Sequence, residues 1–164
     1  DGIAPKTVTV NTDKAEYDYE PLWCDDDFYY TPDETGKTTL KKPWQWNHNP
    51  DNNAWSVTER PGFLRLKNAH IANNIIWARN TLTMRTEGPA CSSVIKLDTS
   101  GMKVGDYAGL SAFQLNYGNV GVYVADDGSR KIYMAKNGGN EIANSSNKII
   151  EQTNMNGKEI YLKN

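Results

Sequence analysis

The chain has 164 residues and a formal net charge of −2, with acidic and basic side chains scattered along its length. This length suits one domain with a sizeable core, and the scattered charge excludes the basic face that nucleic acid requires. No apolar run reaches the roughly 20 residues of a membrane-spanning helix, so no membrane partner is expected.

Residues 1–35 differ from the rest of the chain because they are acidic and rich in tyrosine. The alternating run TVTV (7–10) predicts an entry strand. The stretch that follows predicts a long surface arm, since an acidic run is usually solvated. We therefore expect an N-terminal strand and acidic arm over 1–35 and a β-sandwich module over 36–164.

Three consecutive carboxylates in this arm, Asp25, Asp26 and Asp27, offer a candidate calcium site. Calcium prefers carboxylate and carbonyl oxygens as ligands. Consecutive side chains on an extended chain point to opposite sides, so a solvated acidic turn explains the same residues. We keep both readings, with structural Ca²⁺ as the one cofactor that the sequence suggests.

The stretch PWQWNHNPDNNAWS (43–56) combines three tryptophans, one histidine and four asparagines. Trp44 and Trp46 have period-2 spacing and would share one face of a strand. Their rings would then either fill the core or form a platform for a sugar, because carbohydrate sites use rings for the apolar sugar face and amides for its hydroxyls. The amides also suit turns, since asparagine tolerates left-handed backbone.

The candidate carbohydrate-binding residues are rings and possible hydroxyl partners. Tyr117 lies in LNYGNVG (115–121), which predicts a turn at a sheet edge with an exposed ring. The rings are Trp44, Trp46, Trp55 and Tyr117, and the hydroxyl partners are Asn47, His48, Asn49 and Arg65.

Short alternating runs continue to the end of the chain, and turn signals separate them. Gly128 in DDGS (126–129) predicts a hairpin turn, KNGGN (136–140) predicts another, and TSGMKVGD (99–106) predicts a loop. Residues 68–85 predict a loop with a strand at its end. The remaining predicted strands are 62–67, 92–98, 107–117, 120–126, 130–136, 147–152 and 158–164. This pattern is typical of an antiparallel all-β sandwich or barrel.

No motif for nucleophilic, metal-dependent or nucleotide chemistry occurs in the sequence. The acids available for glycoside hydrolysis are Glu59, Glu87, Asp98 and Asp106. Any β-sandwich carries such acids, and the arginines near Glu59 and Glu87 favour structural ion pairs. We therefore predict no catalytic residue. The two cysteines, Cys24 and Cys91, either pair or remain two separate buried thiols, and the second reading is favoured.

WQWNHNPDNNAWSVTERPGFLRL (44–66) resembles the C-terminal β-sandwich module that accompanies the catalytic propeller in β-xylosidases and α-L-arabinofuranosidases of glycoside hydrolase family 43. The likeness continues through residues 78–122, where an arginine-rich strand, EGP, a loop ending in GD, and AGL occur in the family's order. A looser likeness reaches EIYLK, so the resemblance covers about residues 44–163.

The resemblance implies a concanavalin A-like, xylan-binding type of sandwich that serves xylan or arabinoxylan degradation. The family's catalytic acids lie in the propeller, so the implied partners are a glycoside hydrolase catalytic domain or chain and plant cell-wall polysaccharide. The implied location is secreted, periplasmic or cell-surface. The family module continues with further strands beyond KEIYLKN (158–164), so either the sandwich is truncated at its C-terminal end or another chain supplies the missing strands.

Three functions remain open from the sequence. The favoured one is a non-catalytic carbohydrate-binding accessory module of a xylan-degrading enzyme. The second is a purely structural module that packs against a family 43 propeller and completes it. The third is a glycosidase, either in its own right or as part of an active β-xylosidase or arabinofuranosidase.

Overall fold

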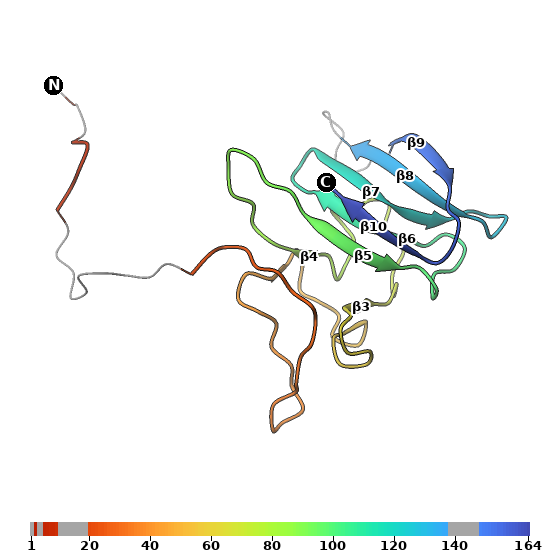
Figure 1. Ribbon diagram of the computed structural model, residues 1–164, viewed down its shortest axis with the longest axis horizontal. Helices are drawn as coiled ribbons and strands as arrows, with labels where there is room; N and C mark the ends of the chain where they lie inside the picture. The colour runs from red at the N-terminus through yellow and green to blue at the C-terminus, as the bar shows by residue number, and fades with distance from the viewer. Residues whose placement is uncertain (1, 3–4, 10–19, 138–147) are drawn as a thin grey trace.

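The computed structural model describes residues 2, 5–9, 20–137 and 148–164 (Figure 1). Within these ranges every regular element is a β-strand and every strand pairing is antiparallel, which confirms the all-β prediction. The strands are β1 Gln45–Trp46, β2 Trp55–Ser56, β3 Arg65–Leu66, β4 Leu82–Thr83, β5 Val94–Asp98, β6 Tyr107–Ala112, β7 Tyr117–Val124, β8 Arg130–Asn137, β9 Lys148–Asn154 and β10 Glu159–Lys163.

The largest sheet has four strands in the order β6-β7-β8-β9. The turn predicted at 126–129 joins β7 to β8. The amide of Ala125 donates to the carbonyl of Ser129 at 2.9 Å. Gly128 takes the positive φ of 79° that favours glycine at such a position. This turn fixes the register of the whole hairpin, in which Val124 faces Arg130.

A two-stranded sheet of β5 and β10 forms the second layer over this sheet (Figure 1). Ile160 faces Leu97 across the pair. Arg130 of β8 donates from its guanidinium to the carbonyl of Thr99, directly after β5, and so links the two layers. Val122 is 0% exposed and Leu162 is 5% exposed, so the shared core lies between these sheets.

Two small pairs, β1 with β4 and β2 with β3, lie to one side of the larger sheets (Figure 1). Each strand has only two residues, because the backbone between them is occupied by turns. The prediction of a loop with a strand at its end over 68–85 is confirmed by β4. These turns carry most of the residues that the sequence nominated for a site.

One predicted strand and one predicted turn lie partly outside the described residues. Residues 7–9 of the predicted entry strand are exposed and form no strand, since no described segment pairs with them; residue 10 lies outside the described residues. The turn predicted at 136–140 falls mostly outside the described residues.

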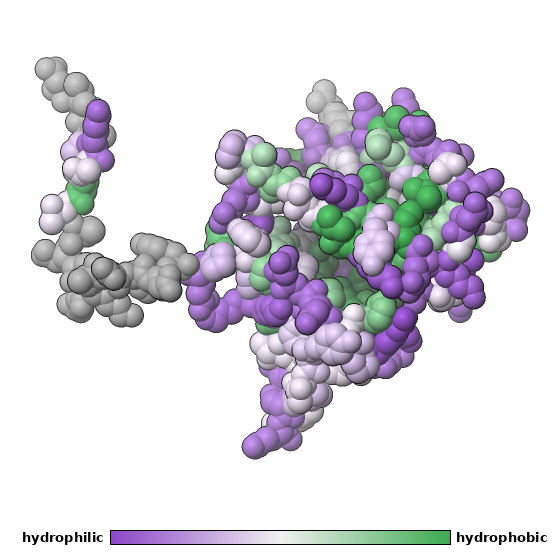
Figure 2. Space-filling view, viewed as in Figure 1, coloured by the Kyte–Doolittle hydropathy of each residue, from purple (hydrophilic) through white to green (hydrophobic). Residues whose placement is uncertain are grey.

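Apolar side chains reach the surface on the face that carries β10 (Figure 2). Met134 of β8 is 48% exposed and shares a sheet face with Arg130, which contacts the second layer.

In the described part of the chain, no helix is long and apolar enough to span a membrane.

Candidate functional site

Trp44 is held in place by a buried carboxylate from the predicted acidic arm. Its indole Nε1 donates to Asp26 Oδ2 at 2.7 Å, and its ring stacks on Phe28 with centroids 5.9 Å apart. The Asp26 side chain is 1% exposed and also accepts from the Tyr30 hydroxyl and from the amide of Phe28. Trp44 is therefore a structural anchor for residues 26–30, which the sequence had placed in a solvated arm.

The hydrogen bonds around Asp26 determine its protonation. Burial alone would raise the pKa of Asp26, but donation from Tyr30, Trp44 and the Phe28 amide, with Lys41 at 3.5 Å, lowers that pKa overall. Burial and the same carboxylate raise the pKa of Tyr30 to about 12. Both groups therefore keep their forms, anionic and neutral, across the ordinary pH range.

The three arm aspartates do not form a common cation site. The oxygens of Asp26 serve protein donors, Asp27 accepts from the amide of Tyr29, and Asp25 is exposed. Among the residues that the structure describes, no group of three or more His, Cys, Asp or Glu side chains could hold a metal ion. Calcium binding stays a prediction, without a ligand set at these positions.

Trp46 and Trp55 pack against each other. Their ring centroids lie 5.1 Å apart at an interplanar angle of 52°, and both side chains are half-buried. The Trp55 indole donates to Asn52 Oδ1 at 2.9 Å. The two tryptophans of WQW thus contact different rings. Trp46 packs on Trp55, whereas Trp44, which precedes β1, packs on Phe28 beside Asp26.

The polar residues after Trp46 clamp a second loop. Asn47 Nδ2 donates to the carbonyl of Ile76 at 3.3 Å, and His48 Nε2 donates to the same carbonyl at 2.5 Å. The Asn47 amide also donates to the carbonyl of Thr81 at 3.0 Å. Both predicted hydroxyl partners are therefore engaged with backbone that lies 28 to 34 residues further along the chain.

The same loop is fixed by a reciprocal pair of bonds to Asp51. The amide of Asp51 donates to Asn80 Oδ1 at 2.9 Å, and Asn80 Nδ2 donates to the Asp51 carbonyl at 3.1 Å. Asn80 adopts a φ of 56°, which asparagine tolerates better than most residues. Arg79 adds a bond of 3.3 Å to the carbonyl of Asn49, whose side chain is exposed.

This clamped loop, defined as residues 74–81, presents Trp77 to solvent. The Trp77 side chain is 56% exposed, although its amide donates to the carbonyl of Asn74 and its neighbours are fixed as described. Trp77 was not among the rings selected from the sequence. The amide-rich stretch 43–56 was the sequence signal that could have indicated this loop. Its residues were interpreted as ligand contacts, whereas in the structure they support loop 74–81.

Arg65 forms an ion pair with the candidate acid Glu59 within the domain. Arg65 Nη1 lies 3.0 Å from Glu59 Oε1, and Lys67 Nζ lies 3.2 Å from Glu59 Oε2. Lys67, followed by Arg65, lowers the pKa of Glu59. A glycosidase acid needs a raised pKa, so the structural reading of Glu59 fits better.

Asp98 serves a similar structural role. Arg60 Nη1 lies 2.5 Å from Asp98 Oδ2, and its guanidinium also lies 3.6 Å from the centre of the Phe63 ring. Arg60 and then Ser100 hold the pKa of Asp98 well below its usual range. Asp106 accepts from Asn68 at 2.7 Å. These acids connect loops to the end of β5 and to the start of β6.

The expectation of an exposed ring at Tyr117 is wrong. Tyr117 begins β7, an interior strand of the four-stranded sheet, and is 4% exposed. Its hydroxyl accepts from Asn137 Nδ2 at 3.0 Å across the β7–β8 pair. The glycines of LNYGNVG suggested a turn, but Gly118 and Gly121 lie within the strand.

Both cysteines are free, which confirms the reading of two separate thiols. Cys91 is exposed, so the expectation that both thiols are buried is wrong for this residue. Cys24 is half-buried, and its amide lies 3.3 Å from Met84 Sδ. Burial raises the pKa of Cys24.

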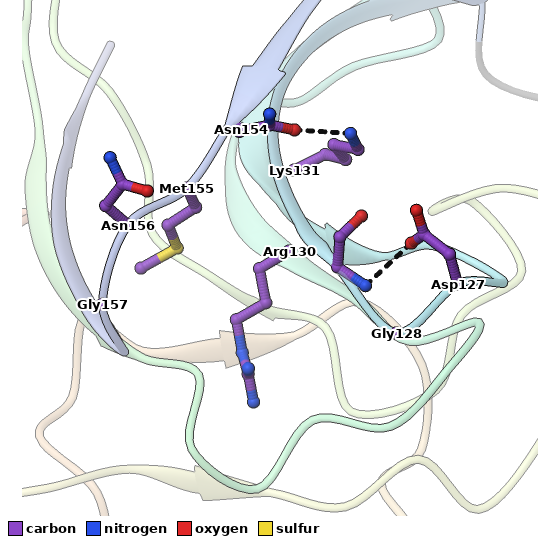
Figure 3. Close-up of a pocket in the computed structure, with 9 residues that line it drawn as sticks. Asp127, Gly128, Arg130, Lys131, Asn154, Met155, Asn156 and Gly157 are labelled. Atoms are coloured by element: carbon purple, nitrogen blue, oxygen red, sulfur yellow. Dashed lines mark hydrogen bonds between the residues drawn. The ribbon is translucent and has the colours of Figure 1, made fainter.

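A pocket of about 420 Å³ opens at one end of the sandwich, where the β7–β8 and β9–β10 turns meet (Figure 3). Its walls are mostly polar, with Met155 as the apolar contribution. The lining residues are Asp127, Gly128, Ser129, Arg130, Lys131, Asn154, Met155, Asn156 and Gly157. The sequence had nominated none of them, because two distant turns create the pocket only in the folded chain.

Comparison with known proteins places the chain in a defined group. The family model described as "Beta xylosidase C-terminal Concanavalin A-like domain" matches residues 33–164. A β-xylosidase from Formosa agariphila is 33% identical over 79% of the chain and 24% of its own length. A putative β-xylosidase from Xylanibacter ruminicola is 42% identical over 41% of the chain and 12% of its own length.

Solved structures agree in fold. A bifunctional GH43-CE protein from Bacteroides eggerthii matches with a TM-score of 0.72 and 43% identity, over 84% of the chain and 17% of its own. The GH43 protein BlXynB from Bacillus licheniformis matches with a TM-score of 0.68 and 28% identity, over 84% and 25%. The chain thus spans a quarter or less of these relatives. It belongs to the C-terminal concanavalin A-like domain family of glycoside hydrolase family 43 β-xylosidases.

Proposed function

We propose that this chain is a non-catalytic, carbohydrate-binding accessory domain of a xylan- or arabinoxylan-degrading enzyme. The observation that carries the proposal is the half-exposed ring of Trp77 on the clamped loop 74–81. A ring carried on a loop that is already fixed requires little ordering of the loop backbone when a sugar stacks on it. Stacking removes apolar area from water at roughly 25 cal/mol per Å².

The polar surroundings of Trp77 support the same function. Arg79 and Asn49 are exposed beside the clamp and can hydrogen-bond the hydroxyls of a sugar that covers the ring. The relatives are named β-xylosidases, and this supports plant cell-wall xylan or arabinoxylan as the ligand class. The proposed partner is a glycoside hydrolase catalytic domain, and the proposed location is secreted, periplasmic or cell-surface.

Affinity electrophoresis in gels containing soluble arabinoxylan tests this proposal. The chain should be retarded, Trp77→Ala should lose most of the retardation, and Trp77→Phe should keep part of it because an aromatic face remains. Trp23→Ala is the matched control, since Trp23 is also exposed, at 48%, and lies outside the clamped loop. Equal retardation of wild type and Trp77→Ala would remove Trp77 from the proposal.

A structural role is the second candidate, and a separate observation favours it. Leu22, Trp23 and Tyr29 are 54%, 48% and 72% exposed on one short segment. Apolar side chains gathered in this way commonly mark a protein contact. If the chain shows no retardation by any xylan, and Leu22→Ser with Trp23→Ser lowers the melting temperature of the complete enzyme, the domain acts by packing.

A further inference from the structure

One row of side chains crosses the four-stranded sheet at the end where the pocket opens. Tyr107 of β6 faces Tyr123 of β7, Tyr123 faces Lys131 of β8, and Lys131 faces Asn154 of β9. Directly paired residues lie on the same face of an antiparallel sheet, so these four side chains form a continuous line. Three strand spacings give the line a length of about 14 Å.

The rings in this row are fixed by their neighbours. Tyr107 and Tyr123 stack with centroids 5.0 Å apart and planes 9° from parallel. Tyr133 meets both edge-on, at 5.5 and 5.9 Å. The Tyr123 hydroxyl donates to Gln152 Oε1 at 2.6 Å. Both the aromatic half of the row and its amide neighbour are therefore set before any ligand arrives.

Exposure increases along this sheet face toward the row. Ala135 and Tyr133 are 1% and 5% exposed, whereas Tyr107 is 47% exposed, and Gln152 and Asn154 are exposed. Tyr107 lies on β6, an edge strand, so the face of its ring that is turned away from Tyr123 lies at the boundary of the sheet. The row thus offers aromatic surface at one end and hydrogen-bonding groups at the other.

The polar end of the row is also the wall of the pocket. Lys131 Nζ donates to Asn154 Oδ1 at 2.5 Å, and both residues line the cavity of about 420 Å³ (Figure 3). Arg130 points away from Lys131 in the same view, as expected for consecutive residues of a strand. Asn156 adds a further amide, and Met155 adds a small apolar surface. Such a lining suits a ligand rich in hydroxyl groups.

We propose that the row from Tyr107 to Asn154, together with this pocket, forms a second binding site for a linear, hydroxyl-rich oligosaccharide. The chain of sugars lies across the strands, stacks on Tyr107, and places one end in the pocket against Lys131, Asn154 and Asn156. This inference rests on the proposed function, since it takes carbohydrate as the ligand class, but it uses none of the residues of loop 74–81.

Xylohexaose is the probe, titrated calorimetrically into the whole chain carrying Trp77→Ala, so that the loop of Trp77 does not mask the second site; the substitutions below are compared in this background. Tyr107→Ala should weaken binding at least tenfold, and Tyr107→Phe should bind within twofold of Trp77→Ala alone because the ring remains. Lys131→Met should weaken binding about fivefold. Tyr161→Ala is the matched control, because Tyr161 is 72% exposed on β10 and belongs to neither proposed site.

Chemical shifts separate loss of contact from loss of fold. In wild type, the amides of 128–131 and 154–157 should shift on addition of xylohexaose, and they should not shift in Tyr107→Ala. If Trp77→Ala abolishes binding while Tyr107→Ala binds like wild type and these amides stay still, the second site is refuted and the proposed function stands. If wild type binds neither xylohexaose nor xylan, both fall.

Discussion

Asp26 is the residue on which the N-terminal part of the domain depends. A carboxylate with 1% exposure is stabilised only when donors surround it, and here an indole, a phenol, a backbone amide and a lysine do so. The sequence presented Asp26 as the middle of three similar acids. Only tertiary packing distinguishes it, since the partner Trp44 lies 18 residues away.

Replacing Asp26 with alanine should lower the free energy of unfolding by about 3 kcal/mol, because Trp44 and Tyr30 keep donors that lose their acceptor. Asp26→Asn should cost less, since one carbonyl oxygen remains, and Asp25→Ala is the exposed control. Urea unfolding measures all three. A loss in Asp26→Ala no larger than in Asp25→Ala would show that the cluster contributes nothing.

The effect of Asp26 should also depend on pH in a defined direction. Its pKa is lowered in the folded chain, so its stabilising contribution is complete above the unfolded pKa of about 4 and disappears as pH falls through the folded value. The difference between wild type and Asp26→Asn should therefore shrink as pH falls below the unfolded pKa and through the lower folded one. Unfolding curves between pH 2 and 7 would reveal a constant difference if this reasoning fails.

At the scale of elements, β6 and β7 approach each other so closely that they require glycine. A Cβ on Gly109 would lie 2.2 Å from the carbonyl oxygen of Val120, and one on Gly121 would lie 2.9 Å from the Tyr133 ring. Tyr133 therefore lies over a strip without side chains. This arrangement positions the tyrosines of the proposed second site.

Gly109→Ala should destabilise the domain by about 2 kcal/mol or more, because backbone atoms rather than a movable side chain occupy the space. Gly118→Ala is the matched control in β7, where an added Cβ meets nothing within 4 Å. Guanidinium unfolding of the two variants provides the comparison. Similar stability of both would mean that the strands can move apart without cost.

The long strands were predictable, and the short ones were not. β5 to β10 follow the period-2 alternation that the sequence displays, and DDGS sets the register of β7 and β8. β1 and β2 have two residues each, too few for any periodicity, so the side chains around them are placed by Asp26, Ile76 and Asn80. Asn47, which the sequence offered as a ligand contact, instead donates to the backbone of the loop that carries Trp77.

For the whole molecule, near-neutral charge predicts how binding responds to salt. The net charge is −2 and no ion release accompanies the binding of an uncharged polysaccharide. Retardation by arabinoxylan should change less than twofold between 50 and 500 mM NaCl. Retardation of the same chain by heparin, a charged polysaccharide, is the comparison. A steep salt dependence of retardation by arabinoxylan would contradict the prediction and indicate that charges carry the binding.

The irregularity between Met134 and Ala135 in the pairing of β8 with β9 also bears on solubility. β9 is the last strand of its sheet among the described residues, and such a border invites pairing with another molecule. A bulge twists the border, and Lys148 and Glu151 place charge along it. Both features hinder the formation of continuous intermolecular sheets at this border.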